Sequence, residues 1–107
     1  MSYFLDWREH EDFRAEKFYK TTLWQGEHVM VGLNCLEPDQ EQLVHAHPDA
    51  DKFYFVLCGS GIFYVGDESG VAQQGTVVMA PAGIPHGVKN QSTDRLTMLV
   101  VIAPGIK

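Results

Sequence analysis

Three histidines have the residue type and spacing that could do chemistry in this chain: His45 and His47, two residues apart, and the later His86. On a β-strand successive side chains point to opposite faces, so the imidazoles of His45 and His47 would share one face. A third imidazole from a neighbouring strand would complete a three-nitrogen set for a divalent metal, leaving positions open for water or substrate. Such a set suits Fe, Mn, Ni, Cu or Zn, and the residue types do not choose among them.

The bulk properties are those of one small globular domain. The chain has 107 residues, of which 45% are hydrophobic and 21% charged, with a formal net charge of −6. This acidic balance argues against a nucleic-acid partner, because no basic surface is available to neutralise phosphates. No segment has the features of a signal peptide or approaches the roughly 20 apolar residues of a membrane span. We therefore expect a cytoplasmic protein with no membrane partner.

The elements that must position the histidines are predicted to be strands. Residues 1–16 are rich in charged and aromatic side chains and are expected to form an N-terminal arm with at most one helical turn. From residue 17 onward, β-branched and aromatic residues alternate between turn residues, which is typical of an all-β sandwich or barrel. The chain should thus consist of the arm and one barrel over 17–107. Strands are expected at 18–24, 28–36, 41–47, 53–57, 62–65, 76–79, 87–90 and 95–102.

One segment resembles a known family motif. Gly75, Pro81, Gly83, His86 and Asn90 stand at the fixed positions of the second sequence motif of the cupin superfamily. The segment 39–59, which holds the histidine pair, an apolar run and Gly59, is similar to the first cupin motif in order and spacing. The resemblance implies a small, single-domain type-2 cupin of the RmlC-like kind, with an all-β jelly roll (double-stranded β-helix). It also implies that the three histidines are metal ligands.

The first motif departs from the family pattern at two positions. Asp39 stands where the family has a glycine, and Lys52 stands where it usually has a metal-binding glutamate. Counting by twos along the strand, Lys52 should point into the barrel and the adjacent Asp51 outward. A slip of one residue or a bulge would instead turn Asp51 inward as a fourth, oxygen ligand. The resemblance therefore implies the three histidine ligands without the carboxylate.

Three roles for Lys52 follow from its charge. An ammonium about 4 Å from one positive charge is disfavoured by about 4 kcal/mol at an effective dielectric near 20, or about three pKa units. A neutral Lys52 could act beside the metal as a base or weak ligand. A charged Lys52 could hold a substrate carboxylate. Alternatively, the site holds no metal, and Lys52 pairs with an acid such as Glu41.

Three functions stay open at this point. The first is a metal-dependent dioxygenase, isomerase or lyase acting on a small, anionic organic molecule. In it Lys52 binds or deprotonates the substrate and Tyr54 supplies a proton. The second is a non-catalytic cupin that binds or senses a small ligand or a metal, and the third is a metal-free remnant. Because exposed strand edges need covering and cupins commonly pair through them, we also expect a homodimer, with the arm as a packing or dimer segment.

Overall fold

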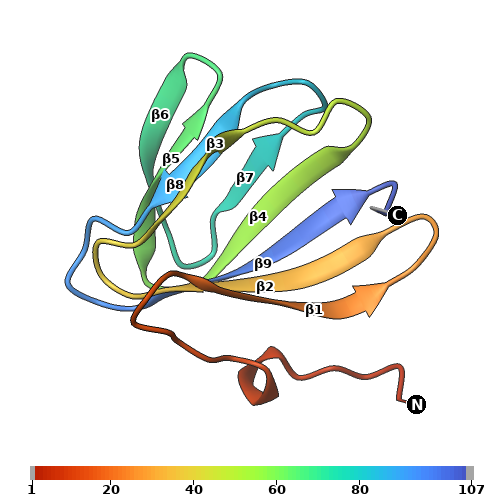
Figure 1. Ribbon diagram of the computed structural model, residues 1–107, viewed down its shortest axis with the longest axis horizontal. Helices are drawn as coiled ribbons and strands as arrows, with labels where there is room; N and C mark the ends of the chain where they lie inside the picture. Colours follow the sequence, from red (N-terminus) through yellow and green to blue (C-terminus); the bar gives the residue numbers. More distant parts are fainter. Residues whose placement is uncertain (1, 106–107) are drawn as a thin grey trace.

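The protein is an all-β jelly roll, as predicted. The computed structural model describes residues 2–105, which form two antiparallel sheets with strand orders β1-β2-β9-β4-β7 and β3-β8-β5-β6 (Figure 1). No helix among these residues is long and apolar enough to cross a membrane. The elements in chain order are η1 (Trp7–Glu9), β1 (Tyr19–Gln25), β2 (Met30–Leu36), β3 (Glu41–His45), β4 (Asp51–Cys58), β5 (Ser60–Val65), β6 (Glu68–Gln73), β7 (Val77–Ala80), β8 (His86–Lys89) and β9 (Leu96–Ala103).

The core lies between the two sheets and follows from the period of two along each strand. In β4, Lys52, Tyr54 and Val56 are buried, whereas their neighbours are less buried or exposed. Strand β9 repeats the pattern, because it pairs with β4 along its whole length. The inward side chains of both sheets meet in one apolar cluster, which includes Phe63 and Met98. This cluster holds the two sheets together and supports the polar end of the barrel interior.

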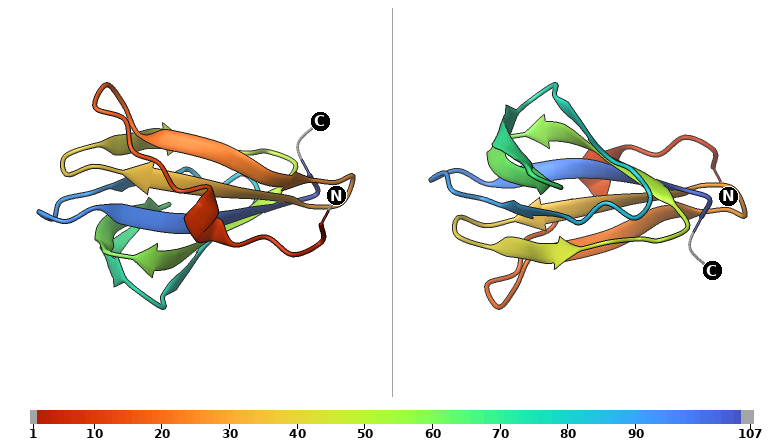
Figure 2. Two further views of the ribbon diagram at one scale, coloured as in Figure 1. Left: turned by 90° about the horizontal axis from the view of Figure 1, so that it is seen from below. Right: turned by 90° about the horizontal axis from the view of Figure 1, so that it is seen from above.

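The N-terminal arm packs on the outer side of the five-stranded sheet (Figure 2). Its one helical turn, η1, begins after Asp6, whose carboxylate accepts a hydrogen bond from the Arg8 backbone N–H. Further along the arm, Glu11 accepts a hydrogen bond from the Thr97 hydroxyl of β9. The guanidinium of Arg95 lies 4.3 Å from the ring centroid of Phe13. The contacts of Glu11 and Phe13 thus hold the second half of the arm against the sheet.

The strand boundaries differ from the sequence expectation by one or two residues, and β6 lies in a segment for which no strand range was expected. Two of the differences have a clear local cause. The strand expected at 28–36 begins at Met30, because the turn before it closes with a hydrogen bond from Gly26 N–H to the Val29 carbonyl. The strand expected at 41–47 ends at His45. Beyond it, the His47 carbonyl accepts a hydrogen bond from Gly83 in the loop before β8, instead of continuing the ladder. His47 therefore lies on a loop.

Gly59, between β4 and β5, supports a first prediction. It has φ +83°, and a Cβ there would clash with the backbone carbonyl oxygen of Arg95. Alanine would add the left-handed backbone cost to this clash, so Gly59→Ala should lower the free energy of unfolding by about 3 kcal/mol or more. Urea denaturation measures this loss.

Gly75 offers the matched control. Its φ is +92°, but an added Cβ would meet no atom within 4 Å. Gly75→Ala should therefore cost only the backbone term, about 1 to 2 kcal/mol. Equal losses at the two glycines would show that the contact with Arg95 does not matter.

Candidate metal centre

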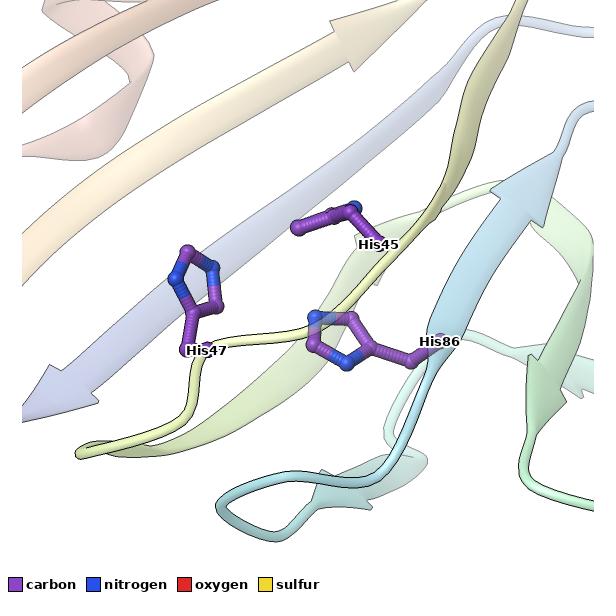
Figure 3. Close-up of side chains that lie close together, drawn as sticks. All are labelled: His45, His47 and His86. Carbon is purple, nitrogen blue, oxygen red and sulfur yellow. The ribbon is translucent and has the colours of Figure 1, made fainter.

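The three histidines come together at one end of the barrel (Figure 3). One ring nitrogen from each of His45, His47 and His86 lies within 4.8 Å of the others. The ring centroids of His45 and His86 are 4.4 Å apart, and those of His47 and His86 are 5.6 Å apart. Two nitrogens bound to one first-row metal ion at about 2.0–2.1 Å are at most about 4.2 Å apart, so small rotations of the rings that draw the nitrogens together would let all three bind one ion.

A strand pairing places two of these rings, and a loop places the third. His45 and His86 are direct partners across the β3–β8 ladder, so their side chains leave neighbouring strands on the same face. His47 reaches the same point from the loop after β3, and the Gly83 hydrogen bond holds its backbone. The histidine pair therefore converges, although the two residues do not share a strand.

Hydrogen bonds orient two of the imidazoles. His45 Nδ1 lies 2.9 Å from the Leu43 carbonyl oxygen, and His86 Nδ1 lies 3.0 Å from that of Ile84. A carbonyl only accepts, so in the neutral ring Nδ1 carries the proton and Nε2 is the nitrogen with the free lone pair. His86 Nε2 is buried and has no hydrogen-bond partner. Backbone bonds of this kind orient metal-binding histidines in proteins.

The electrostatics of the site favour neutral imidazoles. Burial lowers the pKa of His47, and the charge of Lys52 lowers it further. Burial also lowers the pKa of His86, against a smaller opposing effect of its bond to Ile84. Neutral imidazole is the form that binds a metal, since a proton occupies the lone pair of the charged form. These two rings are ready to bind at neutral pH.

Lys52 lies inside the barrel, as alternation along the strand predicts. Its side chain is 3% exposed, and its Nζ lies 4.5 Å from the centroid of the Tyr54 ring. Burial, with a smaller contribution from Lys20, lowers the pKa of Lys52 from 10.5 to about 8. The direction is the one expected from the sequence, but burial causes the shift without any metal charge.

The expected acid partner for Lys52 is not found. Lys52 takes part in no ion pair among residues 2–105. Glu41, the acid considered from the sequence, is exposed at the start of β3. The barrel interior therefore holds a positive charge that no carboxylate of the described chain neutralises, and an anionic ligand could do so.

Asp51 lies apart from the histidine group. It is exposed, and its carboxylate accepts a hydrogen bond of 2.8 Å from the backbone N–H of Ala82. The inward alternative considered for Asp51 is thus not the arrangement of this structure. Instead, its carboxylate stabilises the turn at 81–84, which leads into His86.

Sequence reasoning missed Gln42. Its side-chain oxygen accepts a hydrogen bond from the Tyr54 hydroxyl, inside the barrel and near His86. Counting by twos from His45 assigns Gln42 to the opposite face, but the β3–β8 register shifts between Gln42 and His45. Burial raises the pKa of Tyr54, so its hydroxyl keeps its proton and donates a hydrogen bond to the Gln42 side-chain oxygen. The proton-donor role of Tyr54 in catalysis stays a prediction.

One of the three histidines, His47, borders a pocket that opens to solvent. A pocket of about 580 Å³ borders His47 and is also lined by His28, Asp49, Ala50 and Pro104. It is formed by the β1–β2 turn, the loop before β4 and the segment after β9. A small molecule in this pocket would contact His47.

Comparison with known proteins agrees with the motifs. The cupin domain model matches residues 32–102. An uncharacterized protein of Streptomyces coelicolor is 36% identical over 76 residues, covering 71% of this chain and 70% of that protein. The chain belongs to the cupin family. This cupin is also 27% identical over 92 residues to the uncharacterized YrkC of Bacillus subtilis, covering 80% of the chain but only half of that relative's length.

Several solved structures match almost the whole chain. TT1209 from Thermus thermophilus superposes with a TM-score of 0.91 at 38% identity, covering 94% of this cupin and 96% of that chain. An RmlC-like cupin from Desulfovibrio desulfuricans gives 0.80 at 31% identity, covering 90% and 91%. KdgF from Halomonas sp. gives 0.85 at 16% identity, covering 100% and 96%, which shows a shared fold alone.

Proposed function

We propose that this cupin binds one divalent first-row metal ion through His45, His47 and His86, and that it receives a small anionic organic ligand beside Lys52. The observation that carries the metal proposal is the orphaned Nε2 of His86. Leaving a buried polar atom without a partner costs about 1–3 kcal/mol, which a metal ion would relieve. The backbone bonds at Nδ1 of His45 and His86 support the same donor set.

The proposal that the ligand is an anion depends on Lys52. A buried ammonium without a carboxylate partner is costly, so an anion entering the barrel gains more there than a neutral molecule of the same shape. A bound metal ion would supply Lewis acidity or a position for O2 activation, as in a dioxygenase, isomerase or lyase. Within the chain, Lys52 would hold the ligand's charge, and Gln42 would keep the Tyr54 hydroxyl in place.

A second candidate is a cupin that binds or senses its ligand without turning it over. Two observations favour it. Among the described residues, no carboxylate lies with the three histidines to act as a base, and the Tyr54 hydroxyl already donates to Gln42. Turnover assays would separate the two candidates, since both require the same metal and ligand site.

Metal titration tests the proposal. Protein without a histidine tag, freed of metal by a chelator, should bind one equivalent of Zn2+ or Ni2+ in calorimetry at pH 7.5. The affinity should fall at least about ten-fold by pH 5, because protons then compete for the imidazoles. The lowered pKa values of His47 and His86 should shift this loss toward lower pH than ordinary imidazoles would give.

A second experiment, on the metal-loaded protein, compares the binding of succinate with that of its neutral analogue succinamide. Succinate should bind more tightly, at least about ten-fold, because only it carries the charge that Lys52 complements. No stoichiometric metal binding at pH 7.5 would refute the metal site. Equal affinity for the two compounds would refute the anion preference while leaving the metal site in place.

A further inference from the structure

Lys52 carries a nucleophilic amine in the barrel interior. Its side chain is 3% exposed, and its Nζ makes no ion pair or hydrogen bond with the residues that the structure describes. Its cross-strand neighbours, Ala80 of β7 and Ile102 of β9, are apolar and buried. The amine instead lies 4.5 Å from the centroid of the Tyr54 ring. No polar partner therefore prevents Nζ from forming a covalent bond once it has lost its proton.

Burial also favours the neutral form of this amine, which is the nucleophilic one. It lowers the pKa of Lys52 to about 8, so at pH 7.5 about a quarter of the Lys52 amines are neutral. An ordinary exposed lysine has about one neutral amine in a thousand at this pH. Desolvation of this kind activates lysine as a nucleophile in proteins.

The group of potential metal ligands beside this amine contains no negative charge. Among the described residues, that group holds His45, His47 and His86 and no carboxylate. Burial is the main cause of the lowered pKa values of His47 and His86, and the charge of Lys52 adds to the lowering at both. A divalent ion bound by these histidines would therefore be repelled by the ammonium. Metal binding and the charged form of Lys52 oppose each other.

Building on the metal site proposed above, we propose that Lys52 is a carbamylation site, at which Nζ takes up CO2 and a divalent ion at the three histidines stabilises the carbamate. CO2 suits this position because it is small and neutral. It enters an apolar interior without the desolvation cost that an ionic reagent has. The carbamate and the ammonium that holds an anionic ligand are alternative states of one side chain, so CO2 and succinate should compete.

The reaction needs no oxidant or reductant. The lone pair of neutral Nζ attacks the carbon of CO2, an N–C bond forms, and the electrons of one C=O π bond move to oxygen. One proton leaves the nitrogen for solvent, and the product is Nζ–COO⁻. The side chain thereby changes from positive to negative, so its repulsion of a metal ion becomes attraction. Zinc accepts carboxylate oxygen, and three histidines leave its fourth position open.

Metal binding and carbamylation should therefore strengthen each other. By thermodynamic linkage, the factor by which the metal tightens CO2 uptake equals the factor by which CO2 tightens metal binding. We expect this factor to be at least about ten, because the charge of a desolvated side chain is reversed beside the ion.

Carbon-13 NMR detects the carbamate directly. Tag-free full chain at pH 7.5 with labelled bicarbonate should give a carbamate carbonyl resonance that grows at least about ten-fold when Zn2+ is added. Lys52→Met should remove this resonance, whereas a carbamate at the terminal amine of the chain would remain. Lys17→Met, at an exposed position, is the matched control and should leave the resonance unchanged.

Calorimetry of Zn2+ binding measures the coupling. In buffer depleted of CO2, Lys52→Met should bind Zn2+ more tightly than the wild-type protein, because the ammonium is gone. Bicarbonate should reverse this order, since only the wild-type protein gains a carboxylate. Lys52→Glu carries a permanent carboxylate and should bind Zn2+ equally well relative to Lys52→Met in both buffers. Complexation of Zn2+ by bicarbonate affects all proteins alike, so the ratios of their affinities give the result.

Two results would overturn the carbamylation site while leaving the metal site in place. They are the absence of a Lys52-dependent resonance from zinc-loaded protein, and a ratio of wild-type to Lys52→Met affinities that bicarbonate does not change. Failure of the wild-type protein to bind Zn2+ in either buffer would refute the metal site itself and the carbamylation site with it. Urea denaturation of each variant checks that it is folded.

Discussion

Replacing His86 by alanine is expected to abolish stoichiometric metal binding. The affinity for Zn2+ should fall at least about 1,000-fold, or about 4 kcal/mol, because one of three nitrogen donors is removed. His86 is 1% exposed, and its Nδ1 is already bonded to the Ile84 carbonyl, so Nε2 is the ring atom available to a metal. Among the described residues the group of potential ligands holds only His45 and His47 besides His86. Calorimetry of metal-free protein measures the loss.

The control is His28→Ala. His28 borders the pocket at the barrel opening but does not belong to the histidine group. Its removal should leave the stoichiometry and affinity unchanged. Urea denaturation of metal-free His86→Ala protein would show whether the fold survives the change. Wild-type affinity in folded His86→Ala protein would contradict the metal centre.

Replacing Lys52 by methionine should stabilise the metal-free protein. The pKa of Lys52 falls from 10.5 to about 8 on folding. At about 1.4 kcal/mol per pKa unit, burying this charge costs about 3 kcal/mol at pH 7. The contact of the ammonium with the Tyr54 ring offsets part of that cost, by about 1 kcal/mol. Lys52→Met should therefore raise the free energy of unfolding by about 1 to 3 kcal/mol in urea denaturation.

The pH dependence of this gain follows from linkage. Between pH 8 and 10.5 the unfolded chain binds the Lys52 proton more tightly than the folded chain, so wild-type stability rises with pH. The advantage of Lys52→Met should be full below pH 8 and should vanish as the pH approaches 10.5. Lys17→Met, at an exposed position, should change stability by less than about 0.5 kcal/mol.

Ligand binding gives the same variant a second readout. Loss of the ammonium should strengthen metal binding, because a positive charge no longer opposes the ion. It should also reduce the preference for succinate over succinamide, of which only the part due to the metal charge would remain. Unchanged stability and an unchanged preference would place the Lys52 charge outside the binding region.

Much of the fold could be predicted from local sequence. The glycine and proline positions of 75–90 require particular turns, and Gly75 and Gly83 both have positive φ. Alternation along 51–58 correctly placed Lys52 inside, because a strand buried on one face must alternate. Such features depend on a few adjacent residues.

Features of the site that depend on pairing between distant segments could not be predicted. The register shift that turns Gln42 inward arises where β3 pairs with β8, and no residue type marks it. The hydrogen bond that holds His47 on a loop comes from Gly83, far along the chain. Likewise, the arm could be recognised by composition, but not the sheet face that it covers.

Local sequence was thus sufficient for the residue types of the candidate metal site, for the all-β class and for the absence of a glutamate at position 52. Long-range packing determined which nitrogen of His86 is left without a partner, and that Lys52 has no acid beside it among the described residues. The alternation of side chains along a strand and the conformations that turn residues prefer depend on neighbours in the sequence. In contrast, the convergence of side chains, their desolvation and their pKa shifts depend on atoms brought together across the two sheets.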